Sequence, residues 1–330
     1  MATSSKKSKA KNLQSAPAAS TSRPKSAKQG KAGQLTEDEW RVLTYSIKLG
    51  KCTPFLGAGA SAGVLKTGSE IAETWAKEYD YPLADRTNLI SVSQFLAVKF
   101  DPMFAKYKIV EMFADRAAPK FSDPLEPHMF LGSLPLPIYI TTNYDDFMVQ
   151  GLKRQPLPRD PQKVLCRWNL AVKNLVRDEP NYIELKPDSP LSIARPVVFH
   201  LHGYVPVAES LVLTEDDYMD FLVNMASDDE LIPPQIAKAL TGTIKLFLGY
   251  RIADWNFRVL LRSFERVMER AISRPSIAVM MLPDPAEGTR EEAQAYLTKY
   301  YKNIDVRVYW GKVSEFISEL KNRLDGKPGS

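Results

Sequence analysis

Short apolar runs alternate along the chain with longer segments in which apolar residues recur every three or four positions. The short runs are typical of buried strands, and the longer segments are typical of amphipathic helices. Strands are predicted over residues 52–56, 136–142, 196–201, 243–248, 276–281 and 304–310. Helices are predicted over residues 36–49, 69–79, 87–130, 214–224, 234–240, 254–272 and 313–324. This alternation favours an α/β fold, a Rossmann-like, doubly wound parallel sheet of about six strands with helical insertions.

The composition divides the chain into a tail, a body and a short end. Residues 1–34 carry eight Lys and Arg and no acidic residue, so they account for the whole formal charge of +5. We expect this basic tail to be disordered and to act as a solubilising extension or as a weak nucleic-acid contact. Residues 35–324 are expected to form one domain, with a helical insertion at 87–130 and a small, proline-rich insertion at 151–196. Residues 325–330 form a loose end.

Bulk composition and the metal-binding residue types exclude several classes of protein. The chain is 44% hydrophobic and 25% charged, and no apolar stretch approaches the 18 or more residues of a membrane span. Without a secretory signal pattern, a cytoplasmic protein is expected. Cys52 and Cys166 cannot build a four-cysteine zinc site. His200 and His202 alternate on a predicted strand and are expected to point the same way, but they lack a clear third ligand, so no metal is expected.

A glycine-rich turn follows the first predicted strand. The run Gly57-Ala58-Gly59-Ala60-Ser61 comes directly after residues 52–56, and Gly63 follows shortly afterwards. Such a turn lets the backbone approach a pyrophosphate closely. The spacing fits the dinucleotide fingerprint only loosely, and a tight turn without a ligand explains it equally well. The acidic residue expected near the ribose has only Glu78 and Asp80 as candidates.

Polar residues gather at the carboxyl ends of four predicted strands. These clusters are the Gly57–Ser61 turn, Thr142-Asn143-Tyr144-Asp145, His202-Gly203 and Gly249-Tyr250. In a doubly wound sheet, ligands bind in the crevice at that edge. One such cluster is explained by capping and turn formation, but four together indicate a shared binding site.

Asn143 and His202 are the residues with the clearest chemistry in these clusters. A histidine at a strand end is often structural, and an asparagine there is often a cap, so both readings stay open. Beside a dinucleotide, however, an amide and an imidazole can hold ribose hydroxyls or a water molecule. Glycosidic cleavage through an oxocarbenium-like state requires little more than this positioning and a base.

In this order, the motifs resemble the SIR2-like family over about residues 37–320. The family pattern is a Gly-Ala-Gly-x-Ser turn, a Thr-x-Asn-(Tyr/Ile)-Asp segment and a His-Gly pair. Two further segments are similar to the bacterial branch, and they are Leu213–Tyr218 and Phe247–Asn256. The latter resembles a Gly-Tyr-Ser-x-x-Asp segment that includes Gly249, Tyr250 and Asp254, with Arg251 in place of the usual serine.

The resemblance implies specific roles for these residues. Without the four-cysteine zinc module of the sirtuin deacetylases, the chain looks like the SIR2-like effectors of bacterial anti-phage defence, which cleave NAD to nicotinamide and ADP-ribose. Asn143 and His202 would then be catalytic, Asp145 would contact the carboxamide, and the Gly57–Ser61 turn would contact the pyrophosphate. The remaining residues implied at the NAD site are Thr142, Gly203, Gly249, Tyr250 and Asp254.

The resemblance also implies how activity is controlled. Such relatives often work as homo-oligomers and respond to a partner, such as a HerA-type translocase ATPase or a short Argonaute-like protein. An NAD-dependent protein deacylase is the second hypothesis, with residues 151–196 as a zinc-free small domain. A non-catalytic module that binds NAD or ADP-ribose is the third.

Overall fold

The computed structural model describes residues 34–114, 117–175, 185, 190–228, 231–250, 275–282 and 288–327. The basic tail at 1–34, apart from its last residue, lies outside these residues. So do the predicted helix at 254–272 and Asp254. Among the helices that are described, none is long and apolar enough to cross a membrane.

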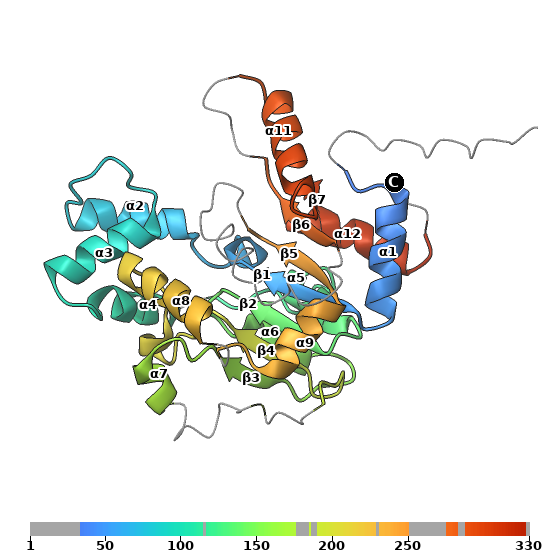
Figure 1. Cartoon of the computed structure of the whole chain (residues 1–330), viewed down its shortest axis with the longest axis horizontal. Coiled ribbons are helices and arrows are strands. Elements are labelled where there is room, and N and C mark those ends of the chain that lie inside the picture. Colours follow the sequence, from blue (N-terminus) through green and yellow to red (C-terminus); the bar gives the residue numbers. More distant parts are fainter. Residues whose placement is uncertain are drawn as a thin grey trace, which may run out of the picture.

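A single parallel sheet of seven strands organises the described part of the chain, in the order β3-β4-β2-β1-β5-β6-β7 (Figure 1). The strands are β1 (Cys52–Leu56), β2 (Ile138–Thr141), β3 (Gln162–Leu165), β4 (Val197–His200), β5 (Ile244–Leu248), β6 (Ser276–Met280) and β7 (Val306–Trp310). All of the neighbouring strands pair in parallel. This confirms the expected α/β class.

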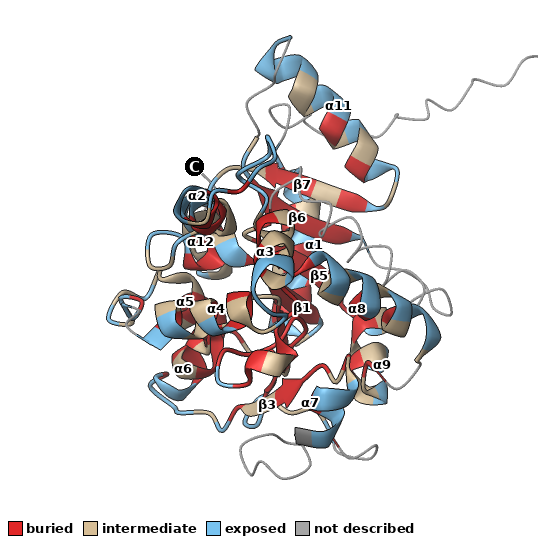
Figure 2. Cartoon of the chain, turned by 90° about the vertical axis from the view of Figure 1, so that its left-hand side faces the viewer, coloured by how far each residue is buried: buried red, intermediate tan, exposed pale blue. Residues whose placement is uncertain are grey.

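The apolar runs form central strands because helices cover the sheet on both faces. Along β1, Phe55 belongs to one hydrophobic cluster and Leu56 to the other. The first face packs against α8 (Glu215–Ser227), α9 (Pro234–Gly242) and α11 (Arg290–Lys302). The second face packs against α1 (Glu37–Lys48), α5 (Pro127–Ser133), α6 (Phe147–Lys153) and α12 (Val313–Leu324). Figure 2 shows the sheet largely as buried and the outer surface of α8 largely as exposed.

A helical module lies beside this sandwich, on the left in Figure 1. It consists of α2 (Gly68–Glu78), α3 (Leu89–Lys99) and α4 (Phe104–Ala114), which have their own hydrophobic cluster. That cluster includes Trp75, Leu96 and Ile109, together with Leu211 and Leu213 from the segment before α8. The module therefore packs directly against the chain that follows β4.

Several boundaries agree closely with the sequence. Thr36 and Thr214 cap α1 and α8 through capping boxes, as expected of a threonine followed by acidic residues. The apolar residues of α8 could be core or interface residues on sequence alone. In the structure, Phe221 belongs to the core, and Tyr218 and Leu222 pack against it.

Other elements differ from the sequence predictions. The 151–196 segment, which the sequence predicts to be a small insertion, contains β3, which pairs in parallel with β4 and brings the strand count to seven. It also contains α7 (Leu170–Leu175). The helices α6 and α11 were not predicted. In α11 only Leu297 and Tyr301 are buried, so its apolar periodicity is weak.

Candidate functional site

The strand order brings the four polar clusters to one edge of the sheet. β4, β2, β1 and β5 are consecutive neighbours, so the segments after them lie side by side in the same order. Across this edge the residues are His202-Gly203, the Asn143 turn, the Gly57–Ser61 turn and Gly249-Tyr250. β2 and β5 flank β1 on opposite sides, so the order of the strands reverses direction at β1. The glycine turn follows β1, and open α/β sheets bind ligands at such a point of reversal.

The glycine turn is built by close contact with the turn after β5. The Gly57 N–H donates to the Leu248 carbonyl over 2.9 Å, and the Gly59 N–H donates to the Gly249 carbonyl over 2.8 Å. A Cβ atom on Gly59 would lie 2.8 Å from the Gly249 Cα, and Gly249 has a φ of +78°. Glycine is therefore required on both sides of this contact.

A dinucleotide fingerprint requires the glycine turn to lead directly into a helix, and this turn does not. Residues Ala58–Ser61 form a short 3₁₀ turn, and α2 begins only at Gly68 after its Thr67 cap. Glu78 is one of the two acidic candidates for the ribose. Its Oε1 lies 3.7 Å from Lys108 Nζ, within the helical module. The site thus differs from that of a typical dinucleotide-binding dehydrogenase.

Asn143 is tied to the glycine turn by its side chain. Its Nδ2 donates to the Gly57 carbonyl over 3.1 Å and to Ser61 Oγ over 3.4 Å. The Asn143 N–H donates to Thr141 Oγ1 over 3.0 Å, which fixes the bend after β2. Its Oδ1 makes no hydrogen bond within the described residues, so this acceptor remains available to a ligand or a water molecule.

Asp145 completes this network from the same turn. Ser61 Oγ donates to Asp145 Oδ2 over 3.3 Å, and the Phe147 N–H donates to Asp145 Oδ1 over 2.9 Å. Ser61 and Asp145 are 3% and 4% exposed, so this polar pair lies beneath the surface of the edge. The network joins Asn143, Ser61 and Asp145, three residues that the sequence assigns to the site.

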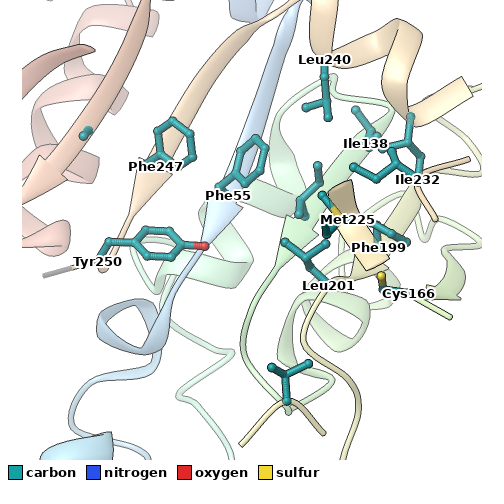
Figure 3. Packing of buried hydrophobic residues seen from close by; sticks show 14 of the residues in the cluster. Phe55, Ile138, Cys166, Phe199, Leu201, Met225, Ile232, Leu240, Phe247 and Tyr250 are labelled. Carbon is teal, nitrogen blue, oxygen red and sulfur yellow. The ribbon is translucent and has the colours of Figure 1, made fainter. Parts of the chain in front are cut away.

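Tyr250 closes the other side of the glycine turn. Its hydroxyl lies 3.2 Å from Thr142 Oγ1, and its ring carbons lie 3.0 Å from where a Gly57 Cβ would be. Figure 3 shows its ring beside Phe55 and Phe247 at the ends of β1 and β5. Tyr250 therefore links the turns after β2 and β5 across the intervening glycine turn.

His202 lies at the opposite end of this row of turns. Its ring packs edge-on against Tyr218 and Phe221 of α8, with centroid distances of 5.5 and 5.1 Å. The ring makes no hydrogen bond within the described residues. Burial lowers the pKa of His202 from 6.5 to about 3, so the imidazole is neutral at physiological pH.

Gly203 lets the chain bend sharply after His202. Its φ is +98°, and a Cβ atom there would overlap the Ser210 carbonyl. The His202 carbonyl accepts from the Val212 N–H over 3.0 Å. The glycine of the His-Gly pair therefore allows close packing against residues 210–212.

The expectation that His200 and His202 point the same way is wrong. β4 ends at His200, and the chain bends before His202, so strand alternation does not continue. The His200 ring contacts Tyr204 with a centroid distance of 5.0 Å, whereas the His202 ring contacts α8. The described residues include no group of three or more His, Cys, Asp or Glu that could hold a metal ion.

The buried rings of His200 and His202 predict acid sensitivity of the fold. Burial, with Lys163 nearby, lowers the pKa of His200 from 6.5 to about 4. Below pH 6.5 the unfolded chain therefore gains a proton that the folded ring does not, and the free energy of unfolding decreases. His200 contributes a loss of about 2 kcal/mol between pH 7 and pH 5. Urea unfolding at both values should show a smaller loss for His200→Phe than for the unmodified chain, and equal losses would contradict the assignment.

The surroundings of His202 and Asn143 include Val212, which sequence analysis did not place there. Tyr144 donates its hydroxyl to the Val212 carbonyl over 2.7 Å, which ties the Asn143 turn to the segment that also holds the His202 backbone. No local motif identifies this contact, because the two residues are 68 positions apart. Of the predicted site residues, only Asp254 lies outside the described part of the chain.

The sequence is similar to a family of known proteins. The family model described as a SIR2-like domain matches residues 137–306. "NAD(+) hydrolase ThsA" from Bacillus cereus (strain MSX-D12) is 26% identical over 221 residues, which cover 66% of this chain and 40% of the relative. The Enterococcus faecium relative of the same name is 25% identical over 244 residues, covering 72% and 45%. The Acinetobacter baumannii (strain 532279) relative is 21% identical over 286 residues, covering 82% and 53%. The chain thus spans about half or less of these relatives.

Proposed function

Because this chain belongs to the SIR2-like domain family, we propose that it is an NAD+ glycohydrolase that releases nicotinamide and ADP-ribose. We propose that it acts in the bacterial cytoplasm as an effector of anti-phage defence. The names of the relatives support the activity. The observation that carries the proposal is the hydrogen bonding of Asn143 to Gly57 and Ser61, which fixes an amide beside the turn at the carboxyl end of β1.

In the proposed site, each of the neighbouring turns contacts a different part of NAD. The Gly57–Ser61 turn would face the pyrophosphate, because it lies at the carboxyl end of β1, where open α/β sheets bind ligands. Asp145 would contact the nicotinamide carboxamide, while Asn143 and His202 would lie toward the ribose. The walls of the NAD site would be completed by Thr142, Gly203, Gly249, Tyr250 and Asp254.

The proposed reaction is hydrolysis of the N-glycosidic bond. As this bond breaks, nicotinamide leaves as a neutral molecule, and positive charge develops on the ribose. Water then adds to the anomeric carbon and loses a proton. Asn143 Oδ1 can accept from that water or from a ribose hydroxyl, and the neutral His202 ring can accept a second hydroxyl proton. Departure of a neutral leaving group needs no metal ion in this scheme.

Incubation of the purified protein with NAD tests the proposal and separates it from the other two functions. The proposal predicts nicotinamide and ADP-ribose in equal amounts without an added peptide. NAD loss that requires an acyl-lysine peptide would identify a deacylase. Binding of NAD by calorimetry without any product, both with and without a candidate partner, would identify a binding module. Either of these results would overturn the proposal.

We further propose that assembly or a separate partner controls the activity, because an unregulated NAD hydrolase would deplete its own cell. A homo-oligomer is expected, with a HerA-type ATPase or a short Argonaute-like protein as candidate partners. The prediction is that specific activity decreases when the protein is diluted through its dissociation range. Light scattering and turnover should be measured on the same dilution series. A monomer with full activity at every concentration, and no partner, would contradict this form of control.

A further inference from the structure

We propose that Lys106 is a positioning residue for His202, acting from the helical module through its ion pair with Asp217. This inference rests on the proposed function, in which the His202 ring faces NAD. Lys106 belongs to α4, and Asp217 is in the first turn of α8, 111 residues later. Lys106 belongs to none of the motifs, and Asp217 lies in the Leu213–Tyr218 segment but has no role assigned from the sequence.

The ion pair is short and shielded from solvent. Lys106 Nζ donates to Asp217 Oδ1 over 2.7 Å, and the two side chains are 7% and 13% exposed. The ammonium also lies 5.5 Å from the centroid of the Trp168 ring. Ion pairs at the surface contribute little to structure, but a buried pair holds its two elements in one arrangement, because separation would leave an uncompensated charge.

Asp217 connects this pair to the segment that precedes α8. Its Oδ2 accepts from the Leu213 N–H over 3.1 Å and from the Thr214 N–H over 3.0 Å. One carboxylate therefore bonds to α4 with one oxygen and to residues 213–214 with the other. Movement of Lys106 would be transmitted to both the helix start and the preceding segment.

The same short segment bonds to the backbone of His202 and to the side chain of Tyr144, the residue that follows Asn143. The Val212 N–H donates to the His202 carbonyl, and the Val212 carbonyl accepts from the Tyr144 hydroxyl, next to Asn143. Trp168, which faces the Lys106 ammonium, donates its Nε1–H to the Ser210 carbonyl over 2.8 Å. Residues 210–214 are thus fixed at one end by Trp168 and at the other by Asp217.

The residues after Asp217 set the position of the His202 ring. Tyr218 and Phe221, one and four positions further along α8, provide the edge-on contacts with the imidazole. His202 makes no hydrogen bond to a described residue, so aromatic packing is what orients its ring. A shift of the first turn of α8 would therefore reorient the imidazole without touching it directly.

Three variants separate positioning from folding. Lys106→Met removes the donor and leaves Asp217 unpaired, and Lys106→Gln keeps a shorter N–H donor. Lys106→Met with Asp217→Asn removes both charges but keeps an acceptor oxygen for residues 213–214, so this double variant should fold if the single one does not. The matched control is Lys173→Met, which breaks a more exposed pair with Asp228 near the other end of α8.

The direct readout is the NMR signal of the His202 ring. The chain has only three histidines, so selective labelling gives three ring signals that single substitutions assign. Lys106→Met and the double variant should shift the His202 signal and lower kcat for NAD at least tenfold, with KM changed less than threefold. Lys106→Gln should give a smaller effect, and Lys173→Met should give none.

An unchanged His202 signal and kcat in a folded Lys106→Met or double variant would overturn the inference. So would equal effects of Lys173→Met and Lys106→Met. A wild-type protein that does not cleave NAD even when assembled and with a partner present would refute the proposed function, yet the NMR comparison would still decide whether Lys106 positions the ring.

Discussion

Replacement of His202 by alanine is expected to lower NAD turnover by about 10²–10³-fold, the size of effect found when one preorganised hydrogen-bonding group is removed from a site where charge develops. Its ring follows β4, at one end of the row of turns that forms the site. Its pKa of about 3 keeps the imidazole a neutral hydrogen-bond acceptor. The measurement is nicotinamide release under saturating NAD, with circular dichroism to verify the fold.

His202→Phe is the matched control for packing. A phenyl ring can keep the edge-on contacts with Tyr218 and Phe221 but provides no nitrogen. We expect His202→Phe to lose as much activity as His202→Ala. Near-normal turnover in either folded variant would show that the imidazole nitrogen is not used.

Replacement of Asn143 by alanine is expected to lower kcat by about 10²-fold, the size of effect found when one preorganised polar group is removed from a site where charge develops. The affinity for NAD should change much less, because the amide acts mainly in the transition state. Steady-state kinetics and calorimetric binding of NAD measure the two effects separately.

Gln155→Ala provides a control for the loss of a buried amide. Gln155 Nε2 donates to the Met129 carbonyl over 3.0 Å and to the Gly151 carbonyl over 2.8 Å, between α5 and α6, so its removal should leave kcat within a few fold. If Asn143→Ala instead raised KM and left kcat unchanged, the amide would have a simple binding role.

The central strands could be predicted because their side chains are buried on both faces. β1 and β5 are continuous apolar runs except for Thr53 and Lys245, and every residue in them is buried. β3 was missed because it is an edge strand whose first two residues, Gln162 and Lys163, are only half-buried. An edge strand of this kind lacks the continuous hydrophobic signal of a central one.

The location of the site could be predicted, but its internal contacts could not. Polar residues at the ends of predicted parallel strands share an edge in any doubly wound sheet, which brings Asn143 close to the glycine turn. The divergence of His200 and His202 depends on where β4 ends, and strand alternation gives no signal of that end. The Lys106–Asp217 pair joins segments 111 residues apart, so only tertiary packing reveals it.

The most direct test of the central claim is the product balance of the wild-type protein with NAD, beside His202→Ala and Asn143→Ala at the same concentration. We expect the assembled wild-type protein to release one nicotinamide and one ADP-ribose for each NAD consumed. The two folded variants should release little of either product. Equal product release by all three proteins would contradict it, as would NAD binding by the assembled wild-type protein, with its partner present, without any release of nicotinamide.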